Sequence, residues 1–148
     1  MDVLDTVIEN RFMVQPNHAN INGTCHGGNV MKWMDEVGAM SAMRFAGQPV
    51  VTARMNEVNF KRPVPIGDTA AIEAYVYQAG TTSVRVRLRA YAENPRTGEK
   101  RLTTESYFVY VAIDDDGEPN EVPPLTVDSV EGEELREDAL TEEPDHVE

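Results

Sequence analysis

The segment GNVMKWMDEVGAMSAMRFAG, residues 28–47, is rich in alanine and methionine and ends in a glycine. Alanine and methionine have high helix propensity, and glycine is the typical residue just beyond the end of a helix. The segment therefore predicts about 18 residues of helix, roughly 27 Å long at 1.5 Å per residue. A helix of that length crosses a small domain from one side to the other, so the remaining elements must pack around it.

Strand-like segments flank this helix, one before it and four after it. Their apolar residues alternate or are β-branched, which favours extended structure, and they cover residues 4–14, 50–60, 69–79, 82–93 and 103–113. In segment 82–93, Val84, Val86 and Leu88 alternate strictly with arginines. Short links rich in proline, glycine and asparagine join the last four strands. This order predicts an α+β fold in which an antiparallel sheet wraps around one long helix.

The negative charge of the chain is concentrated at its C-terminus. Residues 1–113 contain eleven acidic and twelve basic residues, whereas residues 114–148 contain fifteen acidic residues and one arginine. We expect residues 1–113 to form the folded domain. Residues 114–148 form an acidic tail, either disordered or loosely docked, in which 129–140 is a candidate short helix. The near-neutral domain has no basic stripe, which argues against a nucleic-acid partner.

Cysteine usage and hydropathy exclude several kinds of site. Cys25 is the only cysteine, so we expect no internal disulfide and no thiolate metal site. His18 and His26 lack an acidic partner at ligand spacing, so no metal site is expected. The first residues lack a signal-peptide apolar core, and no apolar run reaches the roughly 18 residues of a membrane span. The expected location is the cytoplasm, without a membrane partner.

An acidic residue lies on an apolar row of the predicted helix. Five residues at the three-and-four spacing form this row: Gly28, Met31, Asp35, Gly38 and Ala42. A buried carboxylate costs free energy unless it is paired or reacts, and burial gives it the basicity that a general base near neutral pH requires. The structural alternative pairs Asp35 with Arg44 or Arg54.

Two glycines open the same helix. At Gly27 and Gly28 no side chain covers the N–H groups that form the positive end of the helix dipole. Such donors stabilise an oxyanion, which suggests hydrolysis of an activated acyl group; the alternative is that the glycines only serve helix packing. Gly27 lies eight residues before Asp35, about 12 Å along a helix axis. Two antiparallel helices in a dimer can bring the donor of one subunit to the acid of the other.

The chain resembles the hotdog-fold acyl-CoA thioesterases, in the branch of the cytosolic acyl-CoA hydrolases and their short bacterial relatives. The resemblance extends from about residue 5 to residue 113, and the order and spacing of its motifs are more specific than any one of them. The motifs are N-x-N-G-x-x-x-G-G at 20–28, M-x-W-M-D-E at 31–36, V-N-F-K-R-P-V-P-I-G-D at 58–68, G-T-T-S at 80–83 and Y-F-V-Y-V-A-I-D at 107–114.

This resemblance implies a five-stranded antiparallel sheet curled around a long helix. It also implies a homodimer, assembled further into a hexamer as a trimer of dimers, with coenzyme A bound at subunit interfaces. The catalytic pair falls on Asn20 and Asp35, and the oxyanion donor on Gly27 or Gly28. The implied coenzyme A contacts are Asn59, Lys61, Arg62, Gly80, Thr81, Thr82 and Ser83. Coenzyme A is part of the substrate, so no separate cofactor is implied.

The expected activity is hydrolysis of acyl-CoA to a carboxylic acid and coenzyme A. Asp35 acts either as a general base on water or as a nucleophile that forms a mixed anhydride, and the residues do not separate these routes. A non-catalytic acyl-CoA-binding regulator with the same fold is the alternative function. A hotdog hydratase would need a paired histidine and acid that the sequence does not offer.

Several of these residues also have structural interpretations. Asn20 is a favoured turn residue. Trp33 and the methionines fit a core or a dimer contact, and adjacent Cys25 and His26 make a poor nucleophile pair because neighbouring side chains diverge. The three arginines of segment 82–93 are typical of a solvated strand face, with a subunit contact as the alternative: Arg85, Arg87 and Arg89.

Overall fold

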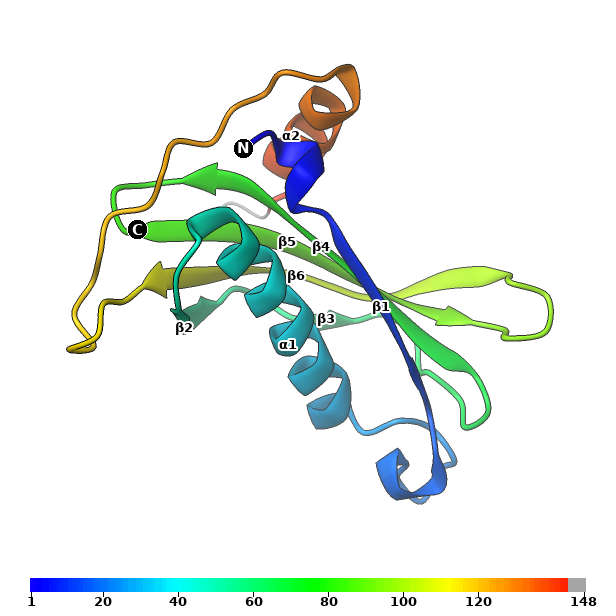
Figure 1. Cartoon of the computed structure of the whole chain (residues 1–148). Helices are drawn as coiled ribbons and strands as arrows, with labels where there is room; N and C mark the ends of the chain where they lie inside the picture. The colour runs from blue at the N-terminus through cyan, green and yellow to red at the C-terminus, as the bar shows by residue number, and fades with distance from the viewer. Residues whose placement is uncertain (144–148) are drawn as a thin grey trace.

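A computed structural model describes residues 1–143 of the chain. One antiparallel sheet curls around the long helix α1 (Gly27–Ala46), and the helix α2 (Val130–Glu142) lies on the other face of the sheet (Figure 1). The 3-10 helices η1 (Val3–Thr6) and η2 (Pro16–His18) flank the first strand. The strands are β1 (Ile8–Met13), β2 (Val50–Met55), β3 (Asn59–Phe60), β4 (Thr69–Ala79), β5 (Ser83–Glu93) and β6 (Lys100–Ala112). The predicted α+β class is confirmed.

The strands follow the order β1-β4-β5-β6-β2, and β3 also pairs with β6. β2 pairs with the end of β6 and β3 with its beginning, so β2 and β3 together form one edge of the sheet. The predicted five strands are therefore present, but the 50–60 strand is interrupted. At the interruption, Ser106 Oγ donates to the carbonyl oxygen of Asn56 at 2.6 Å and to that of Glu57 at 3.2 Å. These side-chain bonds replace part of the ladder, and the strand bends around α1.

Helix α1 begins and ends where its sequence predicts. Gly47 has φ +68°, and its N–H donates to the carbonyl oxygen of Met43 at 2.8 Å, which is the expected glycine stop. Its buried face packs on β4 and β5 and forms the core with them. The large apolar side chains of that face are Val30, Trp33, Met34, Val37 and Phe45. Burying each contributes about 1.5–3 kcal/mol, so the helix is held mainly by this face.

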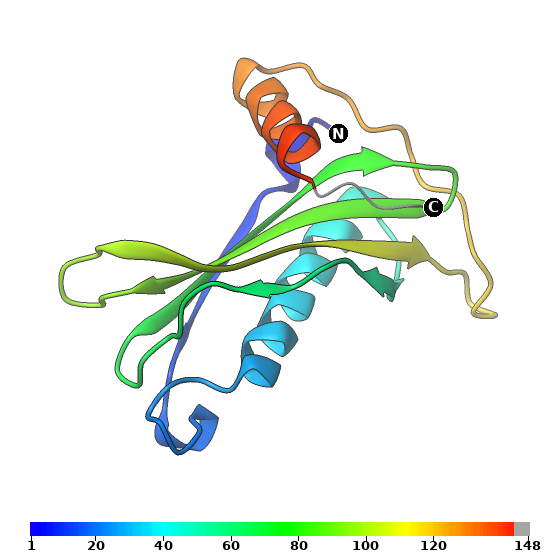
Figure 2. The same ribbon diagram turned by 180° about the vertical axis from the view of Figure 1, so that it is seen from behind.

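The arginines of β5 are not solvated, and this prediction was wrong. They lie on the outer face of the sheet, where α2 covers them (Figure 2). Only 2% of Arg87 is exposed; its guanidinium pairs with Glu142 and donates to the hydroxyl of Tyr75 at 3.1 Å. Arg89 also pairs with Glu142 at 3.0 Å, and Arg85 pairs with Glu143 at 3.4 Å. The alternation of apolar residues and arginines correctly predicted that the arginines share one face of the sheet. It did not predict that acidic residues of the tail pair with them on that face.

The tail runs from the end of β6 along the sheet and then forms α2. Ser129 caps this helix, since its Oγ accepts from the N–H of Gly132 at 2.9 Å, and the same hydroxyl donates to Asp2 at 2.6 Å. These bonds tie the tail to the N-terminal segment. The division of the chain at residue 113 stays a prediction, and its last five residues lie outside the described residues. Within residues 1–143, no helix has the length and apolar character of a membrane span.

The pairing of Glu142 predicts a pH-dependent stability. Burial alone would raise the pKa of Glu142, but the charges of Arg87 and Arg89 outweigh it and hold that pKa below its usual value. The ion pairs of Glu142 therefore stabilise the fold fully at pH values above the usual glutamate pKa. This stabilisation is lost as the pH falls through the lowered pKa of Glu142 in the folded protein. Glu142→Gln should lower the free energy of unfolding at neutral pH and flatten its decline towards about pH 3. Denaturant titrations at both pH values measure this.

Glu137→Gln is the matched control for this prediction. Glu137 lies on the same helix, is exposed and forms no ion pair with any residue the structure describes. The Glu137→Gln substitution removes one negative charge and leaves the ion pairs of the β5 arginines in place. If the two variants gave the same pH dependence, the pairing would not be the source of the stabilisation.

Candidate active site

The loop before α1 is organised by Asn20. Its Oδ1 accepts from the N–H of Asn22 at 2.9 Å and from the N–H and hydroxyl of Thr24 at 3.3 and 3.2 Å. Its own N–H donates to the carbonyl oxygen of Thr24 at 2.8 Å. Across residues 1–143, its side-chain amide nitrogen donates to no group. The turn-forming interpretation of Asn20 is therefore correct for Oδ1, while the Nδ2 donors are left for a ligand.

The first N–H groups of α1 have no acceptor. His26 precedes the helix without a side-chain cap, and the N–H groups of Gly27 and Gly28 donate to nothing in the described part of the chain. A Cβ on Gly27 would lie 3.3 Å from two ring atoms of Phe60, whereas one on Gly28 would meet nothing within 4 Å. The missing side chain at Gly27 thus lets the Phe60 ring lie against the helix start.

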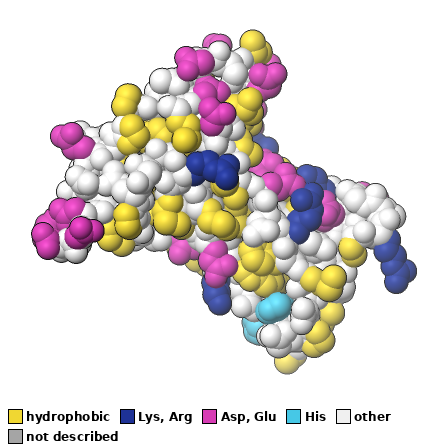
Figure 3. Space-filling model, viewed as in Figure 1, with side chains coloured by type: hydrophobic (Ala, Val, Ile, Leu, Met, Phe, Trp, Pro, Cys, Tyr) yellow, Lys and Arg dark blue, Asp and Glu magenta, His cyan; other side chains and the backbone are white. Residues whose placement is uncertain are grey.

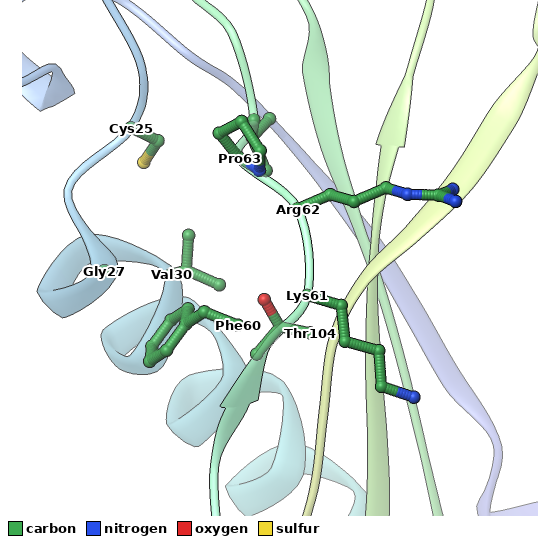
Figure 4. Close-up of a pocket in the computed structure, with 9 residues that line it drawn as sticks. Cys25, Gly27, Val30, Phe60, Lys61, Arg62, Pro63 and Thr104 are labelled. Atoms are coloured by element: carbon green, nitrogen blue, oxygen red, sulfur yellow. The ribbon is translucent and has the colours of Figure 1, made fainter. Parts of the chain in front are cut away.

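A pocket of about 280 Å³ opens beside this helix start (Figure 4). Its lining combines the N-terminus of α1 with β3 and the segment that follows it: Cys25, Gly27, Val30, Phe60, Lys61, Arg62, Pro63, Val64 and Thr104. Lys61 Nζ lies 3.1 Å from Glu105 Oε1. The guanidinium of Arg62 makes no hydrogen bond or ion pair with the residues described. The structure therefore places a predicted oxyanion donor and two predicted cationic contacts around one pocket, with the side chains of Lys61 and Arg62 pointing away from Gly27 (Figure 4), and Asn59 lies on the neighbouring β3.

The turn Gly80–Ser83 lies elsewhere in the subunit. The N–H of Gly80 donates to the carbonyl oxygen of Ser83 at 2.8 Å, and the carbonyl oxygen of Thr82 accepts from the N–H of Ala112 at 3.0 Å. The turn is thus next to the end of β6, whereas the pocket borders Thr104 near its beginning. Eight residues of strand span roughly 27 Å. One subunit does not bring the two predicted groups of coenzyme A contacts together.

Asp35 lies in the third turn of α1 and is half-buried. Its Oδ1 accepts from the hydroxyl of Thr52 at 2.7 Å and from the hydroxyl of Tyr110 at 3.0 Å. No group in residues 1–143 donates to its Oδ2. No ion pair among the described residues joins Asp35 to Arg44 or Arg54, so the structural pairing proposed as an alternative is absent there. One carboxylate oxygen is anchored by two hydroxyls, and the other has no donor among the described residues.

Sequence reasoning did not single out Thr52 or Tyr110. Burial raises the pKa of the Tyr110 phenol well above its usual value, and the neighbouring Asp35 carboxylate adds to this effect. Tyr110 therefore stays protonated and acts as a donor. Thr52 comes from β2 and Tyr110 from β6, and only the pairing of these strands brings both to α1. Gly38 was the feature of the sequence that could have indicated such a contact, because a glycine inside a buried helix face suggests a close neighbour.

Neither a thiolate nor a metal centre forms near the loop. Cys25 is buried, and this burial raises the pKa of its thiol, which keeps it in the unreactive protonated form. His18 Nδ1 accepts from the N–H of Gln15 at 3.1 Å, and its ring meets the edge of Trp33. Among the residues described, no group of three or more His, Cys, Asp or Glu side chains could hold a metal ion.

Comparisons with known proteins identify the family. Residues 22–99 match the family described as the thioesterase superfamily. The acyl-CoA thioester hydrolase YciA of Escherichia coli is 36% identical over 116 residues, which are 76% of this chain and 88% of that protein. The chain belongs to the thioesterase superfamily. The predicted family is confirmed, and with it the hotdog fold.

Solved structures of thioesterase relatives agree with this assignment. An acyl-CoA hydrolase from Staphylococcus aureus, in complex with butyryl-coenzyme A, coenzyme A and coenzyme A disulfide, matches with a TM-score of 0.86 and 30% identity. The match covers 95% of this chain and 86% of that one. A hexameric thioesterase from Yersinia pestis matches with a TM-score of 0.74 and 32% identity, over 78% of this chain and 94% of that one.

Three further structures of the S. aureus hydrolase carry single alanine substitutions, at an asparagine, an aspartate and a threonine. In that protein the asparagine precedes the aspartate by 15 residues, and the aspartate precedes the threonine by 17 residues. Asn20, Asp35 and Thr52 of this superfamily member have the same residue types at the same two spacings. Sequence reasoning named Asn20 and Asp35 but not Thr52.

Proposed function

We propose that this protein hydrolyses acyl-CoA thioesters at a site completed by two copies of the chain. The observation that carries the proposal is the state of Asp35: two hydroxyls hold Oδ1, and Oδ2 is free in the described part of the chain. A carboxylate held in this way has one oriented oxygen with which to take a proton or attack a carbonyl. The thioester-hydrolysing relatives, which match over most of the chain, support the reaction class.

The chemistry assigns a role to each group. Water attacks the thioester carbonyl carbon while Asp35 Oδ2 takes the proton, and the N–H of Gly27, helped by that of Gly28, stabilises the oxyanion. Asn20 Nδ2 orients the water or the substrate. The tetrahedral intermediate then collapses, the C–S bond breaks, and the coenzyme A sulfur receives the proton from Asp35. In the alternative route, Asp35 attacks the carbonyl carbon itself, the C–S bond breaks, and coenzyme A leaves as a thiolate that takes a proton from solvent. Water then hydrolyses the mixed anhydride, which releases the carboxylic acid and restores the Asp35 carboxylate.

The dimer follows from the distance between these groups. Gly27 and Asp35 lie on the same helix, about 12 Å apart along its axis, so one subunit cannot apply both to one carbonyl. Apolar side chains gather over α1 and beside it on one face of the molecule (Figure 3). The exposed ones on α1, β2 and β3 are Met40, Met43, Val51, Met55 and Phe60. A second copy placed with its α1 antiparallel would cover this surface, and the thioesterase relative from Yersinia pestis is hexameric.

Contacts to coenzyme A come from two regions. Arg62 and Lys61 beside the pocket supply positive charge for its phosphates, and Asn59 lies next to them on β3. The turn Gly80–Ser83 lies too far away within one subunit, so we assign its contacts to a neighbouring subunit. There Gly80, Thr81, Thr82 and Ser83 provide backbone N–H and hydroxyl groups for an anion. The coenzyme A site is thus an interface site as well.

A panel of acyl-CoA substrates from acetyl to palmitoyl tests the proposed function, with thiol release followed under steady-state conditions. We expect turnover of some members, and the dependence of kcat/KM on chain length then measures the depth of the acyl pocket. Binding of coenzyme A without turnover of any member would contradict hydrolysis and favour the acyl-CoA-binding regulator. Neither binding nor turnover would contradict both functions.

A further inference from the structure

We propose that Tyr110 is a positioning residue for Asp35 and that Gly38 exists to admit its hydroxyl. The proposal rests on the function proposed above and adds a part of the site that the relatives' substituted residues do not include. The Tyr110 hydroxyl lies 3.0 Å from Asp35 Oδ1 and 3.1 Å from the Asp35 carbonyl oxygen. It therefore contacts both the side chain and the backbone of the same residue.

The contact is built from a rigid group. Tyr110 is fully buried in the core, so its ring cannot move without disturbing neighbouring side chains. Thr52, the other donor to Oδ1, lies on the exposed edge strand β2. Of the two hydroxyls, the one of Tyr110 has its position fixed by packing. It thus defines where Oδ1 sits, and so where Oδ2 points.

Gly38 supplies the space for this hydroxyl. A Cβ at this position would lie 2.4 Å from the Tyr110 oxygen and 3.2 Å from its Cζ. Glycine inside a helix destabilises it relative to alanine, so the helix is weaker there than an alanine would make it. Gly38 is on the same helix face as Asp35, one turn further along. The close approach needs both residues: the tyrosine to donate and the glycine to make room.

The consequence for catalysis is an oriented carboxylate. With Oδ1 held by two donors, rotation about the Cβ–Cγ bond of Asp35 is restricted, and Oδ2 keeps its direction towards the reacting atoms. Without the Tyr110 hydroxyl, the carboxylate keeps the bond to Thr52 but samples other orientations. Small misplacements of a reacting group are costly in rate. Substrate binding, by contrast, does not depend on this oxygen.

Tyr110→Phe removes the hydroxyl and keeps the ring. We expect kcat to fall about tenfold, the scale of one hydrogen bond to a charged group, with KM changed less than about twofold. Tyr107→Phe is the matched control, since Tyr107 lies on the same strand with its ring beside Arg87 on the outer face. This control should keep the wild-type kcat. Thermal denaturation of both variants checks that the fold is retained.

The Asp35→Asn background separates positioning from structure. If Tyr110 acts through the carboxylate, Tyr110→Phe should lower the residual rate of Asp35→Asn by less than about twofold. An equal tenfold loss in both backgrounds would overturn the proposal, and so would an unchanged kcat in the Tyr110→Phe single variant. The proposed hydrolysis would still stand after either result, provided that the Asp35→Asn single variant loses its turnover. Absence of turnover in the wild type would overturn both proposals.

Gly38→Ala tests the contact between the Tyr110 hydroxyl and Asp35 by a change in the helix. Its added Cβ displaces the Tyr110 oxygen, so kcat should fall at least as far as in Tyr110→Phe. In the double variant the closest clashing atom is gone, and its kcat should equal that of Tyr110→Phe alone. A double variant that loses the product of both effects would overturn the role assigned to Gly38. If Tyr110→Phe proves unstable, Gly38→Ala by itself still tests the contact, and an unchanged kcat in that variant would overturn the proposal.

Discussion

We expect Asp35→Asn to lower kcat for acyl-CoA hydrolysis by at least about 100-fold, the usual scale for a lost acid–base group. The asparagine keeps the shape and still accepts from Thr52 and Tyr110, so the local hydrogen bonds change little. It replaces Oδ2 by an amide that neither takes a proton nor attacks a carbonyl. The loss therefore appears in kcat, while KM stays near its wild-type value.

Glu36→Gln is the control for this result. Glu36 is the next residue on α1, is exposed, and forms no ion pair within residues 1–143. The Glu36→Gln substitution removes one negative charge from the same helix turn and leaves the Asp35 carboxylate unchanged. A loss of equal size in both variants would indicate a general electrostatic effect. An unchanged rate in Asp35→Asn would remove Asp35 from the mechanism.

We expect Gly27→Pro to lower kcat by about 100- to 1,000-fold relative to Gly27→Ala, the range for one lost oxyanion donor. Proline has no N–H, so the variant deletes the proposed donor. The helix itself tolerates the change, because proline is favoured at the first helical position. His26 already has φ −57° and ψ 135°, the extended conformation that a residue before proline requires.

The comparison with Gly27→Ala isolates the donor. Both side chains place a Cβ 3.3 Å from the Phe60 ring, and proline also places its Cδ on the nitrogen in place of the N–H. Only the proline variant loses the N–H. Stopped-flow measurement of thiol release, with circular dichroism to verify the helix, gives the two rates. Equal rates would contradict the assignment of the oxyanion donor to Gly27.

Some residues of the candidate site can be predicted from the sequence, and others cannot. Asp35 among apolar helix residues and the Gly27–Gly28 helix start are local patterns, and each predicts chemistry without any knowledge of the fold. Asn20 was named through a family resemblance, because its residue type alone fits an ordinary turn equally well. In the structure its Oδ1 does organise the turn, and only the Nδ2 group remains available.

The arginines of β5 illustrate what a strand pattern leaves open. Alternation places Arg85, Arg87 and Arg89 on one face, but it does not say what lies on that face. A segment more than fifty residues further along returns to cover them, with Glu142 and Glu143 as ion-pair partners. Acidic residues in a tail are ordinarily solvated, and nothing local distinguishes these two from the others.

The sequence by itself determined the central helix with its glycine stop, the strand segments, the acid on the apolar row of the helix and the uncapped helix start. These features depend on residues close together in the chain, where periodicity and capping preferences act. Only the tertiary structure decided that Thr52 and Tyr110 hold Asp35, that Arg62 lines the same pocket as Gly27, and that Gly80–Ser83 lies far from both. Such contacts depend on the register of β2 on β6 and on the packing of α1 against the sheet, which arise from many weak interactions between distant residues.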